Sequence, residues 1–391
     1  MKNKSVLLGV TGGVAAYKSV DLARRLRDAE ASVTVMMTEA SQRFITPLSL
    51  EVASQNRVYS SLFDEPMAHI RLAAEADLII IAPATANSIA KFAHGIADDL
   101  LSTCLLSATG KKIIIAPAMN WRMYENPACR RNLDLLRSVG VLQIGPEQGS
   151  LACGEEGIGR MAEIPEIIDT AIAALSAKDL TGEKVVVTAG PTREYIDPVR
   201  FISNRSSGKM GFALARAARN RGAAVTLVTG PTSLTPPSGI TCIEVETSGE
   251  MLQAVKGQIG AGATILVMAA AVADFSPAGR SNTKIDKKDL VTLALHRTED
   301  IVTAVSSEDR KPFIVGFAAE TGQNLDRAER KMKDKGMDMV VFNDISADGS
   351  GFDTDTNRVV ILDPSGKQEL ELMSKNDVAD AIFNRLLQIK A

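Results

Sequence analysis

Three side chains in the N-terminal half are of types that move protons or hold a carboxylate: His69, Asn120 and Cys153. An imidazole can act as a base near neutral pH, a neutral amide can bind a carboxylate, and a thiol can donate a proton. Each also has an ordinary explanation. A lone histidine is more often a surface or core residue, asparagine is common in turns, and a buried cysteine is usually inert. Taken singly, these residue types do not establish a catalytic site.

The thiol lies in a glycine-rich stretch, and this setting bears on its reactivity. Cys153 belongs to the segment SLACGEEGIGRMAE at 150–163, which contains three glycines within six residues. Glycine loosens a loop, so we expect the thiol to be accessible. A loop of this kind is typical of a flap that closes over a substrate.

Two further loops are candidates for binding an anion. The segment TGGVAAYK at 11–18 could bring backbone amides close to a phosphate at a helix N-terminus. It does not match GxGxxG, so an ordinary strand–helix turn explains it equally well. The segment ISNRSSGKMGFALA at 202–215 fails the P-loop pattern GxxxxGK[ST], because Ser203 replaces the first glycine and Met210 the final hydroxyl residue. It remains a small-residue loop with a lysine at a helix start, compatible with anion binding.

Three cations recur on one predicted helix. In the segment LDRAERKMKDKGMD at 325–338, Arg327, Lys331 and Lys335 are spaced four residues apart. Like charges at this spacing slightly destabilise a helix, so an anionic partner would explain them. The alternative is a solvated face moderated by neighbouring acidic residues, and the helix by itself favours that alternative.

The elements that must position these residues alternate between strands and helices. Apolar stretches at 6–10, 32–37, 77–81 and 112–115 are each accompanied by a helical pattern, which is typical of a parallel sheet covered on both faces. Two of the strands end in the same Ala-Pro-Ala turn, within LIIIAPATAN and IIIAPAMN. Ligands of such sheets bind at the carboxyl ends of the strands, so the sequence predicts one shared pocket.

The second half repeats this organisation after a plausible linker, SAKDLTGEK at 176–184. Strands are expected at 185–192, 225–232, 264–270, 313–317, 339–342 and 359–362. A helix is expected at 209–220, and a final helix opens at Ser374 with Asp377 three residues on, as in a capping box. We therefore predict two α/β domains, residues 1–180 and 181–391.

Composition excludes several other classes of protein. The 391 residues are 45% hydrophobic and 23% charged, with a net charge of −3 that argues against a general nucleic-acid binder. No apolar run reaches the roughly 18–20 residues that span a bilayer. The four cysteines are too few and too widely spaced for a disulfide framework or a zinc site. We expect a cytoplasmic protein without membrane or nucleic-acid partners.

Long motifs occur in order along the whole chain. In the N-terminal half they are TGGVAAYK, HIRLAAEAD, APATANSIAKFAHGIADDLLST, PAMN and ACGEEGIGRM. In the C-terminal half they are VTAGPTREYIDPVRFISNRSSGKMG, AAAVADF, KID, DIV, VGFAAET and the lysine-rich helix ending at NDIS. Together they resemble the bifunctional bacterial phosphopantothenoylcysteine decarboxylases and phosphopantothenate–cysteine ligases of coenzyme A synthesis.

The resemblance implies that the N-terminal half is a flavodoxin-like or Rossmann-like domain that binds FMN. Its flavin would oxidise the cysteine moiety of 4′-phosphopantothenoylcysteine towards a thioaldehyde, so that CO₂ is lost, and then return hydride to give 4′-phosphopantetheine. His69 would be the base, Asn120 the clamp for the carboxylate and Cys153 the proton donor. The residues expected to bind the cofactor are Thr11, Gly12, Gly13, Thr38, Pro83, Thr85, Ala86 and Asn87.

The C-terminal half would then be a second Rossmann-like domain, a ligase that uses CTP as co-substrate. It would activate 4′-phosphopantothenate as an acyl-cytidylate, releasing pyrophosphate, before cysteine attacks. Asn204 would serve the acyl-cytidylate steps, and Mg²⁺ is expected to bridge the nucleotide phosphates. The residues expected at the nucleotide are Ala270, Asp274, Lys284, Asp300, Ile301, Val302, Phe317, Lys331 and Lys335, with the lysines facing phosphates.

Two positions depart from the family pattern, and some alternatives stay open. Tyr124 stands where relatives usually have tryptophan, and Asp286 stands in KID where they often have lysine. One alternative is a decarboxylase with a degenerate ligase domain. Another is a flavin-binding regulatory protein, which would need none of the three candidate catalytic side chains. The family also suggests a homo-oligomer, with flavin-domain trimers, the pocket between subunits, and ligase-domain dimers, jointly a dodecamer.

Overall fold

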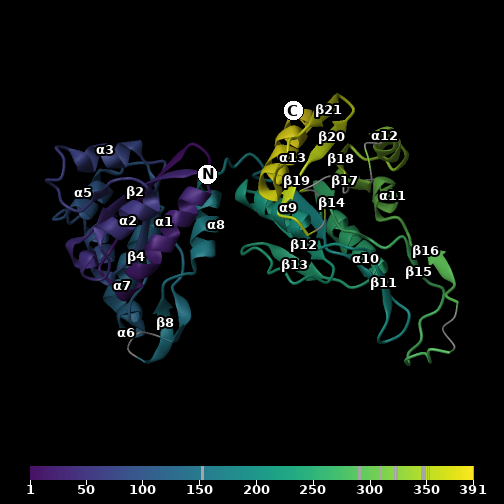
Figure 1. The fold of residues 1–391 in the computed structure, drawn as a ribbon, viewed down its shortest axis with the longest axis horizontal. Coiled ribbons are helices and arrows are strands. Elements are labelled where there is room, and N and C mark those ends of the chain that lie inside the picture. The colour runs from purple at the N-terminus through teal and green to yellow at the C-terminus, as the bar shows by residue number, and fades with distance from the viewer. Residues whose placement is uncertain are drawn as a thin grey trace. The chain divides into compact units, whose positions relative to one another are not determined.

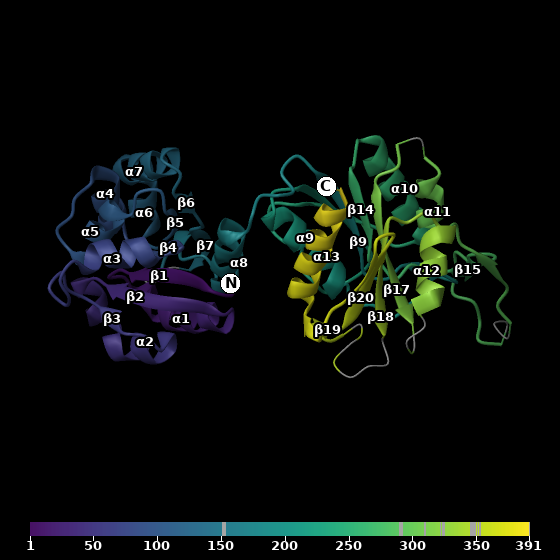
Figure 2. The same ribbon diagram turned by 90° about the horizontal axis from the view of Figure 1, so that it is seen from above.

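The computed structural model describes residues 1–150, 154–288, 292–308, 310–320, 322, 325–344, 349, 351 and 353–390. The chain forms two compact units, Met1–Ser176 and Ala177–Ala391 (Figures 1 and 2). The division falls at the start of the segment 176–184. No helix in the described ranges is long and apolar enough to cross a membrane.

The first unit is built on a six-stranded parallel sheet, as the apolar runs predicted. Its strand order is β3-β2-β1-β4-β5-β6. The strands are β1 (Lys4–Val10), β2 (Ala31–Met37), β3 (Val58–Tyr59), β4 (Leu78–Ala84), β5 (Lys112–Pro117) and β6 (Leu142–Gln143). Chain order reverses between β1 and β4, which is the place where open parallel sheets leave a crevice for ligands.

Helices cover both faces of this sheet, so its central strands are buried throughout. Along β1, Leu8 faces one core while Leu7 faces the other, because successive side chains of a strand point to opposite faces. One face packs against α1 (Lys18–Asp28), α2 (Pro47–Ser54) and α8 (Ile164–Leu175). The other packs against α3 (Ala68–Glu75), α4 (Ala86–His94), α5 (Leu100–Ser107) and α7 (Pro127–Ser138).

The glycine-rich stretch folds as an antiparallel hairpin outside the main sheet. Its strands are β7 (Glu147–Ser150) and β8 (Glu156–Arg160), and the short helix α6 (Trp121–Glu125) lies beside β8. Residues 151–153, which include Cys153, lie outside the described residues.

The second unit contains an eight-stranded sheet with the order β13-β12-β9-β14-β17-β18-β20-β21. The first six strands run parallel, whereas β20 and β21 are antiparallel additions at one edge. The strands are β9 (Lys184–Ala189), β12 (Ala224–Thr229), β13 (Thr241–Glu244), β14 (Ile265–Met268), β17 (Phe313–Glu320), β18 (Met339–Asp344), β20 (Val359–Asp363) and β21 (Gly366–Glu369).

This sheet is also covered on both faces, as Figure 2 shows. One face packs against α9 (Lys209–Asn220) and α13 (Lys375–Lys390). The other packs against α10 (Ser248–Gly260), α11 (Ile301–Ser306) and α12 (Leu325–Asp334). Short strand pairs extend from it: β10 (Arg193–Tyr195) with β11 (Phe201–Ser203), β15 (Phe275–Pro277) with β16 (Leu295–Arg297), and β19 (Thr356–Asn357) with β22 (Met373–Ser374).

Candidate active sites

The first unit has a cavity of about 1160 Å³ at the carboxyl ends of β1, β2, β4 and β5. Its walls combine the loop after β1, the residues that follow β2, the first turn of α4 and the turn after β5. Six of the eight residues expected to bind the cofactor line it: Gly12, Gly13, Thr38, Thr85, Ala86 and Asn87. The two Ala-Pro-Ala turns meet at one cavity, as the sequence predicted.

The other two expected residues support the cavity from behind. The buried Thr11 hydroxyl donates to the Pro83 carbonyl (2.8 Å) and accepts from the Thr85 backbone N–H (3.1 Å). These bonds hold the loop after β1 beside the loop after β4. Thr11 and Pro83 therefore fix the walls, and neither is among the described residues that line the space.

Glycine is required where two of these loops approach each other. A Cβ atom at Gly12 would lie 2.4 Å from Ala40 Cβ, closer than two carbons can pack. On the opposite wall the Thr85 hydroxyl caps α4 by accepting from the Ser88 N–H (3.4 Å). The first N–H groups of a helix lack intrahelical partners, so the start of α4 can present donors to an anionic or carbonyl group in the cavity.

Asn120 lies on the wall formed by the turn after β5. Its Oδ1 accepts from the Arg122 N–H (2.9 Å), so the side chain caps α6. The adjacent Met119 N–H donates to the Gly159 carbonyl (3.0 Å), which joins this turn to β8 of the hairpin. The amide is therefore held at the junction of two loops, with part of its surface open to the cavity.

The hairpin is attached to α6 through close packing and two polar contacts. A Cβ atom at Gly157 would lie 2.8 Å from Trp121 Cβ, so only glycine permits this approach. Trp121 Nε1 and the Arg122 guanidinium both donate to the Glu155 carboxylate, at 2.8 and 2.7 Å. The start of β8 in the predicted flap is thus fixed beside α6. Cys153 itself is not among the described residues.

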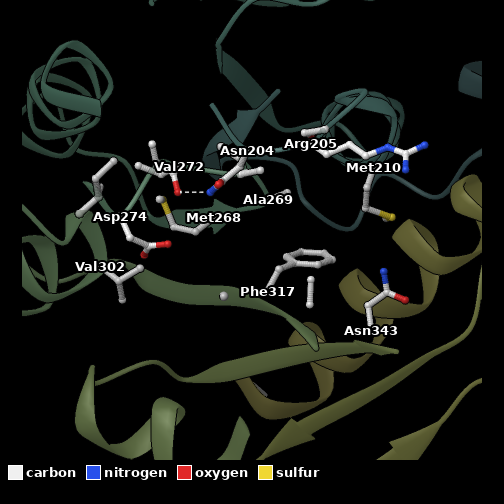
Figure 3. Close-up of a pocket in the computed structure, with 18 of the residues that line it drawn as sticks. Asn204, Arg205, Met210, Met268, Ala269, Val272, Asp274, Val302, Phe317 and Asn343 are labelled. Atoms are coloured by element: carbon white, nitrogen blue, oxygen red, sulfur yellow. Dashed lines mark hydrogen bonds between the residues drawn. The ribbon is translucent and has the colours of Figure 1, made fainter. Parts of the chain in front are cut away.

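The second unit has a cavity of about 930 Å³ at the corresponding edge of its sheet. Asn204 and eight of the nine residues expected at the nucleotide line it: Ala270, Asp274, Asp300, Ile301, Val302, Phe317, Lys331 and Lys335. Figure 3 shows Phe317 in the middle of the cavity, with Asp274 and Val302 towards one end and Met210 and Asn343 towards the other. Lys284 is not among the described lining residues. Its neighbour Ile285 instead donates its N–H to the buried Asp197 (3.2 Å).

The cations of α12 reach this cavity, where protein groups already contact them. Lys331 Nζ donates to the Phe317 carbonyl (3.2 Å), and burial, reinforced by the nearby Lys335 charge, lowers the pKa of Lys331. Lys335 pairs with the Asp300 carboxylate. Burial opposes ionisation of Asp300, but hydrogen bonds from Lys335 and the Thr303 N–H outweigh it and lower the pKa of this carboxyl.

Comparison with known proteins assigns each of the two units to a protein family. The model of the "Flavoprotein" family matches residues 1–176, and that of the "DNA/pantothenate metabolism flavoprotein C-terminal domain" matches residues 180–389. The Bacillus subtilis "Coenzyme A biosynthesis bifunctional protein CoaBC" is 45% identical, covering 99% of this chain and 97% of that protein. The protein of the same name from Escherichia coli K12 is 44% identical, with the same coverage. The chain belongs to the CoaBC family.

A solved structure of the C-terminal domain of a CoaBC protein shares 37% identity, with a TM-score of 0.47, and covers 55% of this chain and 98% of that chain. Membership of the CoaBC family rests on the full-length relatives. The chain is a bifunctional enzyme of coenzyme A biosynthesis, with a flavoprotein decarboxylase and a phosphopantothenate–cysteine ligase on one polypeptide. The alternative of a decarboxylase with a degenerate ligase domain is not favoured.

His69 is expected to be catalytic, but it does not line the flavoprotein cavity of its own chain. It lies half-buried on α3, where its backbone carbonyl accepts from Ser107 Oγ (2.9 Å). It is not among the described residues that line the flavoprotein cavity. Exposed apolar side chains occur on α3 and α5 and in the segment just before α3: Ile70, Leu106, Phe63 (93%) and Met67. An exposed apolar patch of this kind is typical of a protein–protein interface.

Sequence reasoning missed several polar residues of both cavities. In the flavoprotein cavity Lys91 pairs with Asp98 (2.6 Å) and Asp99 (3.1 Å), and the bond to Asp98 raises the pKa of Lys91. These three lie in one quoted motif, so their spacing was a usable signal. In the ligase cavity Asn343, Asn357 and Lys375 were missed. Asn343 begins the quoted segment NDIS, so a signal was present there, whereas Asn357 and Lys375 lie in no quoted motif and only the fold brings them to the site.

Proposed function

We propose that residues 1–180 bind FMN and decarboxylate 4′-phosphopantothenoylcysteine, and that residues 181–391 make this substrate with CTP. The observation that carries the proposal is the composition of the two cavities. Six of eight expected cofactor residues and eight of nine expected nucleotide residues lie on their walls, although they come from distant parts of the chain. Unrelated loops would not assemble these residues at the carboxyl edges of both sheets.

The residues of the first cavity fit FMN. The close approach at Gly12, the capped start of α4 and the hydroxyl of Thr38 supply small, donor-rich walls for a phosphate and a polar ring edge. When bound, FMN supplies the removal and return of a hydride. Lys18 and Arg160 lie on the same wall and share Glu163 (3.1 and 3.0 Å), so the positive charge near the hairpin is balanced by the protein.

The protein groups would orient the substrate and handle its protons. Asn120 is neutral, so it can hold the substrate carboxylate without stabilising it so strongly that loss of CO₂ is disfavoured. The hairpin fixed beside α6 would exclude water from the reacting carbon, and Cys153, which lies between its two strands in the sequence, would donate the final proton. His69 would act as the base towards the substrate.

We further propose that His69 acts in the cavity of a neighbouring subunit, within a homo-oligomer whose flavin domains form trimers. Its separation from Asn120 within one chain and the exposed apolar residues around it support this arrangement. A cyclic trimer would pair the α3–α5 surface of one protomer with the cavity edge of the next. Ligase-domain dimers would complete a dodecamer.

Subunit complementation tests this placement. Two inactive variants, His69→Gln and Asn120→Asp, would be co-expressed with different tags, and the mixed oligomers isolated through both tags. The Asn120→Asp substitution keeps the oxygen that caps α6 but introduces a charge that repels the substrate carboxylate. Roughly a quarter of the sites in random mixtures would hold both intact residues, so decarboxylation of supplied substrate should recover to about that fraction. The mixed oligomers must keep the size and flavin content of the parent variants. If they then decarboxylated no faster than either parent variant, both residues would act within one chain.

In the second cavity the reaction would proceed by two displacements. A carboxylate oxygen of 4′-phosphopantothenate attacks the α-phosphorus of CTP, and the α–β bridging bond breaks to release pyrophosphate. The cysteine amine then attacks the acyl carbonyl, loses a proton and expels CMP. Asn204 Nδ2 donates to the Val272 carbonyl (2.8 Å), which fixes this amide beside the space where the acyl group would lie (Figure 3).

Charge in the cavity suits a nucleotide with a divalent cation. Among the described residues no group of three or more His, Cys, Asp or Glu side chains could hold a metal alone. Mg²⁺ bound through phosphates needs only one or two carboxylates, and Asp274 lies on the cavity wall. The pairing of Lys335 with Asp300 leaves this lysine close to neutralised, so it suits the ribose or base better than the terminal phosphates.

A further inference from the structure

A buried threonine joins the two loops of the ligase unit that carry Asn204 and Asp274. Thr192 lies between β9 and β10 and is 0% exposed. Chain order in the second sheet reverses between the neighbouring strands β9 and β14, and an open parallel sheet leaves its ligand crevice at such a point. Thr192 is not among the described residues that line the cavity, so it can act on the reaction only through its neighbours.

The Thr192 hydroxyl binds one peptide group of the loop that follows β14. Its Oγ1 accepts from the Ala273 N–H (3.0 Å). The carbonyl of the same peptide group belongs to Val272, and it accepts from Asn204 Nδ2 (2.8 Å; Figure 3). A peptide group is planar and rigid, so a bond that fixes its N–H end also fixes the direction of its carbonyl. Thr192 therefore orients the Asn204 amide through a single peptide group.

A second contact from Thr192 reaches the strand that leads to Asn204. The Thr192 carbonyl accepts from Ser203 Oγ (2.7 Å). Ser203 is the last residue of β11 and directly precedes Asn204. One buried residue thus holds both the backbone before Asn204 and the peptide group to which the Asn204 side chain is bonded.

The nucleotide side of the same loop has an anchor of its own. Thr298 Oγ1 donates to the Ala273 carbonyl (2.7 Å), and the Thr298 N–H donates to the Asp274 carbonyl (3.0 Å). Asp274 should therefore keep its place when the bond from Ala273 to Thr192 is lost. The influence of Thr192 is thereby directed to Asn204 rather than to the residues expected at the nucleotide.

The flavoprotein unit has a comparable hydroxyl at the same point of its sheet. Thr11 follows β1, and its buried hydroxyl joins the loop after β1 to the loop after β4. Chain order reverses between β1 and β4, as it does between β9 and β14. Burial of a hydroxyl is unfavourable unless it is hydrogen-bonded, so a threonine at this point is explained by its bonds to the crevice loops and not by packing alone.

We propose that Thr192 is a positioning residue of the ligase reaction, which directs the Asn204 amide towards the acyl group of the acyl-cytidylate. This rests on the ligase function and the role of Asn204 proposed above. Without the hydroxyl, the Ala273 N–H, in a residue that is 2% exposed, would lose its partner. The peptide group would turn, and the Asn204 amide would no longer be held in one direction.

Two substitutions separate the hydroxyl of Thr192 from its shape. Thr192→Val keeps the shape and removes the oxygen, whereas Thr192→Ser keeps the oxygen and removes a methyl group. Full-length protein would be assayed with 4′-phosphopantothenate and cysteine at varied CTP, by CMP release. In Thr192→Val, kcat should fall about tenfold or more while KM for CTP changes less than about threefold. Thr192→Ser should keep at least about half of the wild-type kcat, because the acceptor of the bond remains.

The order of the two variants decides between positioning and packing. Equal losses of kcat, or an impaired Thr192→Ser beside an active Thr192→Val, would show that Thr192 acts by filling space and would overturn the proposal. A KM for CTP that rose as far as kcat fell would also overturn it, because the whole cavity would then have loosened. Decarboxylation of supplied 4′-phosphopantothenoylcysteine should be the same in both variants and in wild type.

A further variant keeps the proposal testable if Thr192→Val does not fold. Ser203→Ala removes the second contact at an exposed residue, where loss of one hydroxyl leaves the core intact. Its kcat should fall about threefold or more at unchanged KM for CTP, because the backbone before Asn204 is released. An unchanged kcat in Ser203→Ala would then refute the positioning role.

A matched threonine at the other end of the same two strands provides the control. Thr264 directly precedes β14, and its Oγ1 accepts from the N–H of Lys184, the first residue of β9 (3.0 Å). Thr264→Val should therefore ligate as wild type does. If wild type released no CMP from CTP, the proposed ligase function itself would fail. If wild type did so and Thr192→Val kept its kcat, the positioning role alone would fail.

Discussion

In the ligase cavity, burial and neighbouring charges give the two lysines of α12 different electrostatic environments. Lys331 and Lys335 are one helical turn apart, yet they differ in environment. Lys335 is compensated by Asp300, whereas Lys331 contacts the Phe317 carbonyl and has its pKa lowered by burial and by Lys335. Because its pKa is lowered, Lys331 loses its positive charge at a lower pH than an ordinary lysine does.

A pH prediction follows for Lys331. CTP binding should weaken as pH rises through the lowered pKa of Lys331, since deprotonation removes a positive charge beside an anionic ligand. The decline should begin below the ordinary lysine value of about 10.4. Titrations between neutral pH and pH 10 would measure it, with Lys331→Met expected to bind more weakly and to lose this pH dependence.

The control is Lys333, an exposed lysine of the same helix. Lys333→Met should keep the wild-type pH profile. An unaltered profile in Lys331→Met would assign the dependence to another group.

At the level of elements, the hairpin β7–β8 is positioned by one glycine. Gly157 packs against the Trp121 side chain, while Glu155 is held by Trp121 and Arg122. The contact fixes the start of β8, which follows directly on the segment that contains Cys153. Because Cys153 lies four residues before Gly157 in the sequence, a shift at Gly157 should reach the decarboxylation chemistry.

Gly157→Ala tests the seating of the hairpin. The added Cβ would meet Trp121 at 2.8 Å, so the hairpin must move, at a cost of about 1–3 kcal/mol. Decarboxylation of supplied 4′-phosphopantothenoylcysteine should slow roughly tenfold or more, because small misplacements of reacting groups cost large factors in rate. Ligase activity should be unchanged. Gly257→Ala, where a Cβ meets open space, is the control, and a normal rate in Gly157→Ala would contradict the account.

The individual strands and helices show why much of the fold could be predicted from the sequence. Each apolar run of the parallel strands is buried on both faces, so the sequence pattern reports the structure directly. The last helix begins after Ser374, whose hydroxyl accepts from the Asp377 N–H (3.1 Å), as its local cap predicted. The antiparallel addition of β20 and β21 was not predictable, because strand direction depends on pairing partners outside the segment.

The sites were predictable where residues lie in loops directly after strands, as with Asn120 and Thr85. Lys375 and Asn357 could not be found this way, because a lysine at a helix start and an asparagine in a two-residue strand are ordinary in sequence. Only the packing of β19 beside β22 and of α13 beside α9 brings them to the cavity. His69 illustrates a different limit, since it does not line the cavity of its own chain and its action in a neighbouring subunit is a proposal.

At the level of the whole molecule, the two units catalyse consecutive reactions. The ligase unit would make the cysteine adduct that the flavoprotein unit would decarboxylate, so one chain would convert 4′-phosphopantothenate to 4′-phosphopantetheine. Each unit has its own sheet, its own pair of cores and its own cavity. Activity of each unit should therefore survive inactivation of the other.

One incubation tests this central claim most directly. Full-length protein with bound FMN would be mixed with CTP, Mg²⁺, cysteine and 4′-phosphopantothenate, and the products followed by mass spectrometry. We predict CMP and pyrophosphate, a transient 4′-phosphopantothenoylcysteine, and its replacement by 4′-phosphopantetheine, lighter by one CO₂. Asn204→Asp should abolish the first step yet still decarboxylate supplied adduct. An adduct that never forms, or one that accumulates without loss of CO₂, would contradict the account.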